Sequence, residues 1–167
     1  MALIIEDGTI VADANSFIDL AYARAFAEAR GVTLSADDVI LEVSVIKAMD
    51  YIIEFEPNLK GDRLGTVQEL MYPRENVLYF GEYLDDGVMP KELLNAQAQA
   101  VMDIAAGTDP TPNGTTGHVI KNKVGPIEQE FSDKGSPSVK PILRKVEVML
   151  APLLKNTAGG GITTRRV

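Results

Sequence analysis

The sequence predicts a mainly α-helical fold: a small bundle of about four helices with one β-hairpin and an extended C-terminal tail. Apolar residues recur at helical spacing in several stretches, and another stretch alternates about a Gly-Pro turn. The C-terminal end has no periodicity. We therefore expect residues 1–154 to form a helical domain carrying a hairpin at 118–131, followed by a flexible tail at 155–167.

The chain is expected to begin with a short β-like segment, residues 1–12, and to continue with a helix over residues 20–30. Asp19 is a good N-cap, because its carboxylate can accept from the free N–H groups of the first turn. Gly31 can take the positive φ that often follows a helix. The buried face of this helix should hold Leu20, Ala23, Phe26 and Ala27.

Residues 36–56 are expected to form the central helix. At 100° per residue its apolar positions cover about half the circumference, which is wider than the stripe of an ordinary surface helix. This helix should therefore touch at least two neighbours. Ser35 is the expected N-cap, with Asp37 and Asp38 at the positive end of the helix dipole. The apolar arc contains Val39, Leu41, Val45, Ile46, Ala48, Met49, Ile52, Ile53 and Phe55.

Pro57 should end the central helix, because a residue before proline avoids the α region. Residues 57–89 are rich in glycine, proline and asparagine and are expected to be irregular, although a short helical turn at 66–71 fits the pattern. Leu70 and Tyr72 are expected to plug one end of the bundle.

A second long helix is expected from Pro90, as its N1 residue, to about residue 106, with Gly107 after its end. Its alanines permit close helix packing. One face should hold Leu94, Ala98, Val101 and Ala105, with Leu93, Ala100 and Ile104 beside them.

Residues 118–131 carry the clearest β signal. If Gly125-Pro126 form a two-residue turn, Val124 pairs with Ile127. The same register pairs Lys123 with Glu128, Asn122 with Gln129, Lys121 with Glu130, and Ile120 with Phe131. It places the lysine–glutamate pairs on one face and the apolar residues on the other, and a slip of one residue breaks both sets. Because a lone hairpin is marginal in water, we expect it to lie on the helices or on another chain.

The last helix is expected over residues 138–150, with Pro141 in its first turn and Pro152 limiting it. Its stripe should hold Ile142, Val146, Met149, Leu150 and Leu153. The basic tail that follows, with three glycines at 159–161, is expected to order only against a partner.

Composition excludes several classes of protein. The chain has no cysteine, hence no disulfide, thiol nucleophile or cysteine-based zinc site. It has no apolar run long enough to span a membrane and no signal-peptide pattern at its start, so we expect synthesis in the cytoplasm. Its net charge is −8, whereas a free-standing nucleic-acid binder usually carries a basic patch.

No motif for catalysis or cofactor binding stands out. His118 is the only histidine, and no serine–histidine–aspartate arrangement is supported. Asp85 and Asp86 precede a glycine in what we interpret as a turn, not in the spacing of a calcium loop. We therefore expect no enzyme activity, no cofactor and no metal.

Six stretches carry a family resemblance; in order they are IIEDGTIVADANSFIDLAYARAFAEARG, VSVIKAMDYI, LMYPRENV, VMPKELLNAQAQAVM, VIKNKVGPIEQEF and VEVMLAPLL. Together they resemble the head–tail connector (adaptor, or head-completion) proteins of tailed bacteriophages, in the group labelled DnaT-like. Tyr72 departs from the family pattern, in which tryptophan is commoner before Pro-Arg.

The resemblance implies a structural subunit of a connector ring, typically twelve-fold, at the head–tail junction of a virion, made in the cytoplasm of the bacterial host. Its implied partners are further copies of itself, the portal protein and a tail-side connector or tail-terminator protein, and genomic DNA would pass through the lumen without specific binding. The implied portal contacts are Thr163, Thr164, Arg165, Arg166 and Val167. Contacts between subunits are expected from the hairpin residues Ile120, Lys121, Lys123, Val124, Ile127, Glu128, Glu130 and Phe131.

Two other functions stay open at this point. A DnaT-like protein that binds single-stranded DNA would need cationic side chains beside stacking aromatic rings, and a salt-sensitive gel shift would favour it. An enzyme of unknown type would need a deep pocket lined by convergent polar groups.

Overall fold

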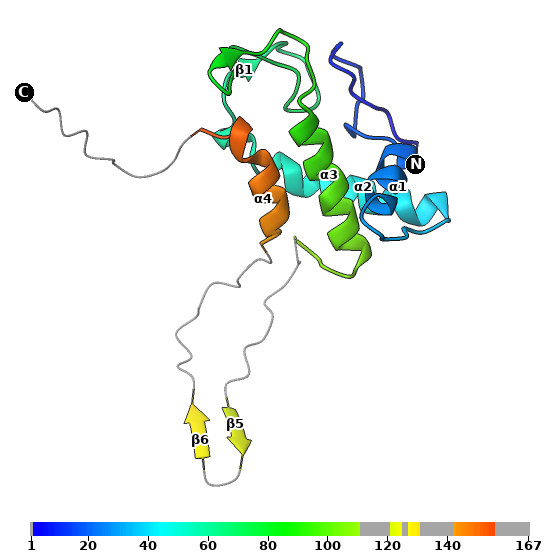
Figure 1. Cartoon of the computed structure of the whole chain (residues 1–167), viewed down its shortest axis with the longest axis vertical. Helices are drawn as coiled ribbons and strands as arrows, with labels where there is room; N and C mark the ends of the chain where they lie inside the picture. Colours follow the sequence, from blue (N-terminus) through cyan, green and yellow to red (C-terminus); the bar gives the residue numbers. More distant parts are fainter. Residues whose placement is uncertain (1, 111–120, 125–126, 131–141, 156–167) are drawn as a thin grey trace, which may run out of the picture.

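The computed structural model in Figure 1 describes residues 2–110, 121–124, 127–130 and 142–155. Its described residues are mainly helical, with four α-helices and small antiparallel strand pairs, as expected from the sequence. The helices are α1 (Leu20–Glu28), α2 (Asp38–Ile53), α3 (Lys91–Ala105) and α4 (Arg144–Leu150). Helix α3 lies at the centre, packed against α2, α4 and α1 (Figure 1).

Helix α1 has the predicted cap. The Asp19 carboxylate accepts from the backbone N–H of Tyr22. Gly31 has φ +72° in the turn after the helix, where its N–H donates to the carbonyl of Glu28. Three of the four predicted face residues, Ala23, Phe26 and Ala27, are buried, whereas Leu20 is half-buried.

Helix α2 packs on both α3 and α1, which confirms that the central helix has two neighbours. Its cap is Asp37, not Ser35: the Asp37 carboxylate accepts from the N–H groups of Val39 and Ile40. The Ser35 hydroxyl instead accepts from the N–H of Asp37, so Ser35 binds the backbone of the residue that caps the helix. The neighbours do not cover the whole apolar arc, and Val39 and Ile53 in particular are exposed.

Helix α3 begins one residue later than predicted, with Pro90 as the N-cap. Its alanine-rich face is buried, which brings the backbones of neighbouring helices close. Ala105 was placed on that face by periodicity but is exposed, because it lies in the last turn. Gln97 and Gln99 are buried instead, which apolar periodicity did not predict.

The segment between α2 and α3 folds into short elements at one end of the bundle (Figure 1). They are the 3-10 turn η1 (Glu56–Asn58) and the strands β1 (Asp62–Arg63), β2 (Arg74–Glu75), β3 (Leu78–Tyr79) and β4 (Glu82–Tyr83). Strand β1 pairs with β2, and β3 pairs with β4. The helical turn proposed for residues 66–71 does not form, but Leu70 and Tyr72 are buried as predicted.

The N-terminal segment does not form a strand; it contributes one isolated bridge between Ile5 and Ser16. Among the described residues of the last helix, the predicted stripe is confirmed at Val146, Leu150 and Leu153, which are fully buried. Ile142 was wrongly placed on that stripe: it precedes the first helical turn and is exposed.

Strands β5 (Lys121–Val124) and β6 (Ile127–Glu130) pair in the predicted register. Val124 lies opposite Ile127, and Lys121 opposite Glu130. The turn residues 125–126 and the outer pair Ile120 and Phe131 lie outside the described residues.

Candidate functional site

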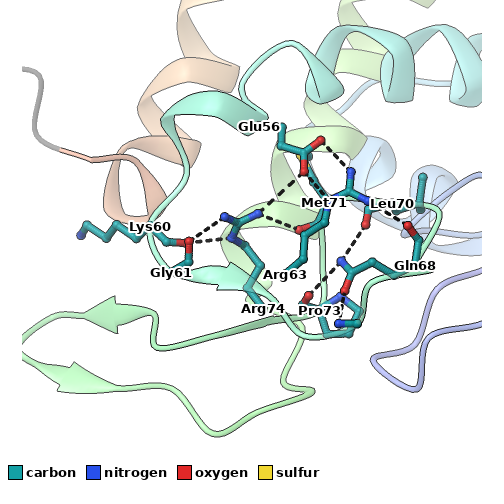
Figure 2. Close-up of polar contacts among 10 residues, drawn as sticks. Glu56, Lys60, Gly61, Arg63, Gln68, Leu70, Met71, Pro73 and Arg74 are labelled. Atoms are coloured by element: carbon teal, nitrogen blue, oxygen red, sulfur yellow. Dashed lines mark hydrogen bonds and ion pairs between the residues drawn. The ribbon is translucent and has the colours of Figure 1, made fainter.

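In the part of the chain that the structure describes, a polar cluster with many hydrogen bonds surrounds Arg74 (Figure 2). Its guanidinium donates to the carbonyls of Lys60 (2.8 Å), Gly61 (2.6 Å) and Met71 (3.2 Å). Arg74 is buried, and Glu56 lies 3.9 Å away as a counter-charge. A buried guanidinium needs such partners, so Arg74 holds two loop segments together.

Glu56 also receives a two-pronged contact from Arg63, whose Nε and Nη2 donate to its two oxygens at 2.6 and 2.9 Å (Figure 2). This bond to Arg63 lowers the pKa of Glu56, and the same bond raises the pKa of Arg63. The third guanidinium nitrogen of Arg63 donates to the Gln68 carbonyl. All its donor nitrogens thus serve protein groups, as expected of a structural cluster.

Gln68 completes the cluster. Its side-chain oxygen accepts from the N–H of Gly65. Its side-chain nitrogen donates to the carbonyls of Leu70 and Pro73 (Figure 2). These bonds replace strand pairing in the turn that carries the Tyr-Pro-Arg motif. The motif is therefore explained by folding and requires no ligand.

Glu6, in the N-terminal stretch that begins IIEDGT, has a similar structural role. The buried Glu6 carboxylate accepts from the backbone N–H groups of Gly8, Ile10 and Val11 at 2.8, 3.1 and 2.9 Å. A carboxylate is the natural acceptor for several converging N–H groups. Glu6 therefore shapes the loop that follows it.

Gln97 of α3 fastens this N-terminal arm to the bundle. Its side-chain oxygen accepts from the N–H of Phe17 at 3.0 Å, and its nitrogen donates to the Ser16 hydroxyl at 2.9 Å. The buried glutamine thus gives the backbone N–H of Phe17 and the Ser16 hydroxyl a partner from α3.

A different kind of site lies between α1 and the start of α3. This groove has a volume of about 370 Å³. We call it the α1–α3 groove. It is lined, among the described residues, by Tyr22, Ala25, Phe26, Ala29, Arg30, Lys91 and Asn95. Tyr22, Phe26 and Arg30 come from successive turns of α1 and the turn after it, so helical spacing brings them together.

The α1–α3 groove combines aromatic and cationic groups. The Arg30 guanidinium stacks 3.4 Å from the centre of the Phe26 ring, and the Tyr22 hydroxyl donates to the Asn95 side-chain oxygen at 2.9 Å. Burial raises the pKa of Tyr22, and the positive charge of Arg30 opposes that shift. None of the described lining residues is acidic, so Arg30 and Lys91 give the groove a positive character within an acidic protein.

A second group of aromatic residues is exposed on the β3–β4 hairpin. Phe80, at its tip, is 78% exposed and packs edge-to-face against Tyr79 at 4.5 Å between ring centres. A hydrogen bond to Glu92 raises the pKa of Tyr79 to about 12. Carboxylates surround this hairpin in the sequence, so its charge does not suit a polyanion.

Within residues 2–110, 121–124, 127–130 and 142–155, no three His, Cys, Asp or Glu side chains are grouped as a metal site. Over those same ranges, no helix has both the length and the apolar character needed to cross a bilayer.

The residues predicted for portal contact, Thr163 to Val167, lie outside the described residues, as does His118. The hairpin register is confirmed for the pairs from Lys121–Glu130 to Val124–Ile127. A role of the hairpin between subunits stays a prediction. The α1–α3 groove was missed because periodicity assigned Phe26 to the core and gave no reason to join residues 22–30 to residues 91–95.

The fold and the groove define a small, mainly α-helical domain with one cationic, partly aromatic groove at its described surface. The chain belongs to the family described as “Putative DnaT-like ssDNA binding protein”, whose model matches residues 1–167. Comparison with curated proteins and with solved structures gave no match.

This family match corrects the function expected from the resemblance. A subunit of a connector ring was the wrong main interpretation, because the family is described by binding of single-stranded DNA, which was our alternative. The description names binding and no reaction, which is compatible with the expectation of no enzyme. The twelve-fold ring, the portal and tail-side partners, and the location in a virion stay predictions of the resemblance.

Proposed function

We propose that this protein binds single-stranded DNA and that the α1–α3 groove is its binding surface. The observation that carries the proposal is the pairing of two cations, Arg30 and Lys91, with the Tyr22 ring in a groove lined by no described acidic residue. The family description supports the same class of ligand.

Each group has a chemical counterpart in a nucleotide strand. Arg30 and Lys91 suit successive phosphates, and the guanidinium plane, already stacked on Phe26, offers a second flat surface to a base. Tyr22 offers a ring for stacking, and unpaired bases expose the faces that stacking needs. The groove should therefore prefer single strands to duplex.

The net charge of −8 limits this binding. Long-range repulsion opposes the approach of a polyanion, so affinity has to come from short-range contacts in the groove. We expect binding that is modest, confined to a few nucleotides and readily lost as salt increases.

The test is fluorescence anisotropy of a labelled oligo-dT at several salt concentrations. Two phosphate contacts predict a slope of log K against log salt of about −1.4, and Arg30→Ala or Lys91→Ala should each reduce its magnitude by about 0.7. Tyr22→Leu should weaken binding by about 1–3 kcal/mol through lost stacking. The control is Lys145→Ala, an exposed lysine of α4 outside the groove.

Circular dichroism should show that each variant stays folded. Absence of DNA binding by the wild-type protein at low salt would refute the proposed function. Binding that Lys145→Ala reduces as much as Lys91→Ala would remove the groove as its site.

A further inference from the structure

Helix α2 is apolar on more sides than its neighbours cover. Leu41, Val45 and Ile52 are fully buried toward the bundle. On another face, Val39 is 67% and Val43 52% exposed. An apolar face that a helix leaves open in its own domain marks a contact surface.

The open face has the spacing of a coiled-coil seam. We call Val39, Val43, Ile46, Asp50 and Ile53 the α2 seam. Its members are separated alternately by four and three residues, so they correspond to heptad positions d, a, d, a and d. A straight α-helix drifts only about 20° per heptad from this 3.5-residue repeat, so over two heptads a slight left-handed supercoil keeps the seam facing one neighbouring helix.

The surface of the seam is hollowed in a way that fits a side chain. An apolar hollow of about 170 Å³ is lined by Val39, Glu42, Val43, Ile46 and Lys47. Four of these residues, at positions d, g, a and d, form the hole that receives one a-position side chain of a parallel partner helix. The residue that would enter this hole from a second copy is Val43.

The charges beside the hollow complement each other between two copies. Glu42 occupies position g and Lys47 the following position e, on opposite edges of the seam. In a parallel pair, position g of one helix lies next to the following e of the other, so both Glu42–Lys47 pairs form. In an antiparallel pair, position g faces position g and position e faces position e, so Glu42 would lie next to Glu42 and Lys47 next to Lys47.

We propose that the α2 seam binds the same seam of a second copy of this chain, with the two α2 helices parallel and related by a two-fold axis. Such an interface is self-complementary, as two-fold symmetry requires. Asp50 at an inner position faces its own copy and opposes the association, and the seam is short. We therefore expect reversible dimers at high protein concentration.

The test exchanges charges and measures dimer dissociation by sedimentation equilibrium. Glu42→Lys and Lys47→Glu each turn two attractive pairs into two repulsive ones, so each should weaken the dimer about tenfold. An equimolar mixture of the two variants restores both pairs and should associate more tightly than either variant alone. Lys145→Glu on the exposed face of α4 is the matched control and should have no effect.

Two further variants test the heptad assignment. Asp50→Leu removes the repulsion and should tighten the dimer, whereas Val43→Asp at the exposed centre should abolish it while helicity by circular dichroism is kept. A wild-type protein that stays monomeric at all concentrations, or a charge mixture no tighter than its components, overturns the proposal. The result is independent of DNA binding, because no seam residue lines the α1–α3 groove.

Discussion

At the scale of single residues, several buried polar side chains of this protein bind backbone groups of its loops. Glu6 closes one loop by accepting three N–H bonds, and Arg74 joins two others through carbonyls. Tyr72 is the exception among the described residues: its hydroxyl is buried and has no hydrogen-bond partner. A buried hydroxyl without a partner costs stability.

Tyr72→Phe should therefore leave the free energy of unfolding unchanged or raise it by up to about 1 kcal/mol. Tyr51→Phe is the matched control, because the Tyr51 hydroxyl accepts from the buried N–H of Leu143 at 3.3 Å. That variant should lose about 1–2 kcal/mol. Urea unfolding measures both, and an equal loss in the two variants would contradict the assignment.

Because of Tyr72, we also expect the free energy of unfolding to depend on pH in the alkaline range. Burial raises the pKa of Tyr72 from 10 to about 12. As pH rises, the Tyr72 hydroxyl therefore loses its proton more readily in the unfolded chain than in the folded one. Deprotonation does not affect stability below pH 10, and it lowers the free energy of unfolding as pH rises from 10 toward about 12. The wild-type protein should lose more stability than Tyr72→Phe over that window, and parallel curves for the two would refute the effect.

At the scale of elements, the strands β1 and β2 depend on one close approach of backbone. Gly61 has φ +68°, and a Cβ atom there would overlap the carbonyl oxygen of Glu75. Gly31 has nearly the same φ, +72°, but open space around it. Comparing substitutions at Gly31 and Gly61 therefore separates the cost of a positive φ from the cost of the close approach to Glu75.

Gly31→Ala should cost about 1–2 kcal/mol, since a side chain disfavours the left-handed region. Gly61→Ala should cost that amount and at least about 1 kcal/mol more, because strand β2 has to move. Thermal unfolding at equal buffer conditions provides the comparison. Equal losses would mean that the β1–β2 approach is not tight in solution.

At the scale of the whole molecule, the end of the described chain fastens the segment after α2 to the bundle. The 3-10 turn η2 (Ala151–Leu153) follows α4, and the N–H of Lys60 donates to the Leu153 carbonyl at 2.9 Å. The Lys60 ammonium donates to the Pro152 carbonyl at 2.7 Å, and the N–H of Lys155 to the Asn58 carbonyl at 2.7 Å. Segments about ninety positions apart in the chain are thereby joined.

Leu153→Ala should therefore destabilise the whole domain by about 2–5 kcal/mol, since Leu153 is fully buried at this junction. Val148→Ala, on the exposed face of α4, should change stability by no more than about 0.5 kcal/mol. Hydrogen exchange should show that Leu153→Ala weakens protection in residues 58–75 as well as in α4. Loss confined to α4 would contradict the proposed coupling.

Much of the helical architecture was predictable because its signals are local. Asp19 caps α1, the Val124–Ile127 register follows from one turn, and the period of α2 calls for two neighbours. The choice between Ser35 and Asp37 as cap was not predictable, since both are good caps and the entry path of the chain decides between them. Strands of two residues have no period to detect.

The helices, the hairpin register and the residues able to fill a core could be predicted from residue spacing, because spacing along one chain sets which side chains share a face. The roles of Arg74, Gln97 and the α1–α3 groove, in contrast, depend on the packing of distant segments. Their partners are distant in sequence, and no local pattern shows which backbone groups will lack hydrogen bonds until the helices have packed. The same packing left the α2 seam open, although the sequence had placed three of its residues, Val39, Ile46 and Ile53, on the apolar arc of the central helix.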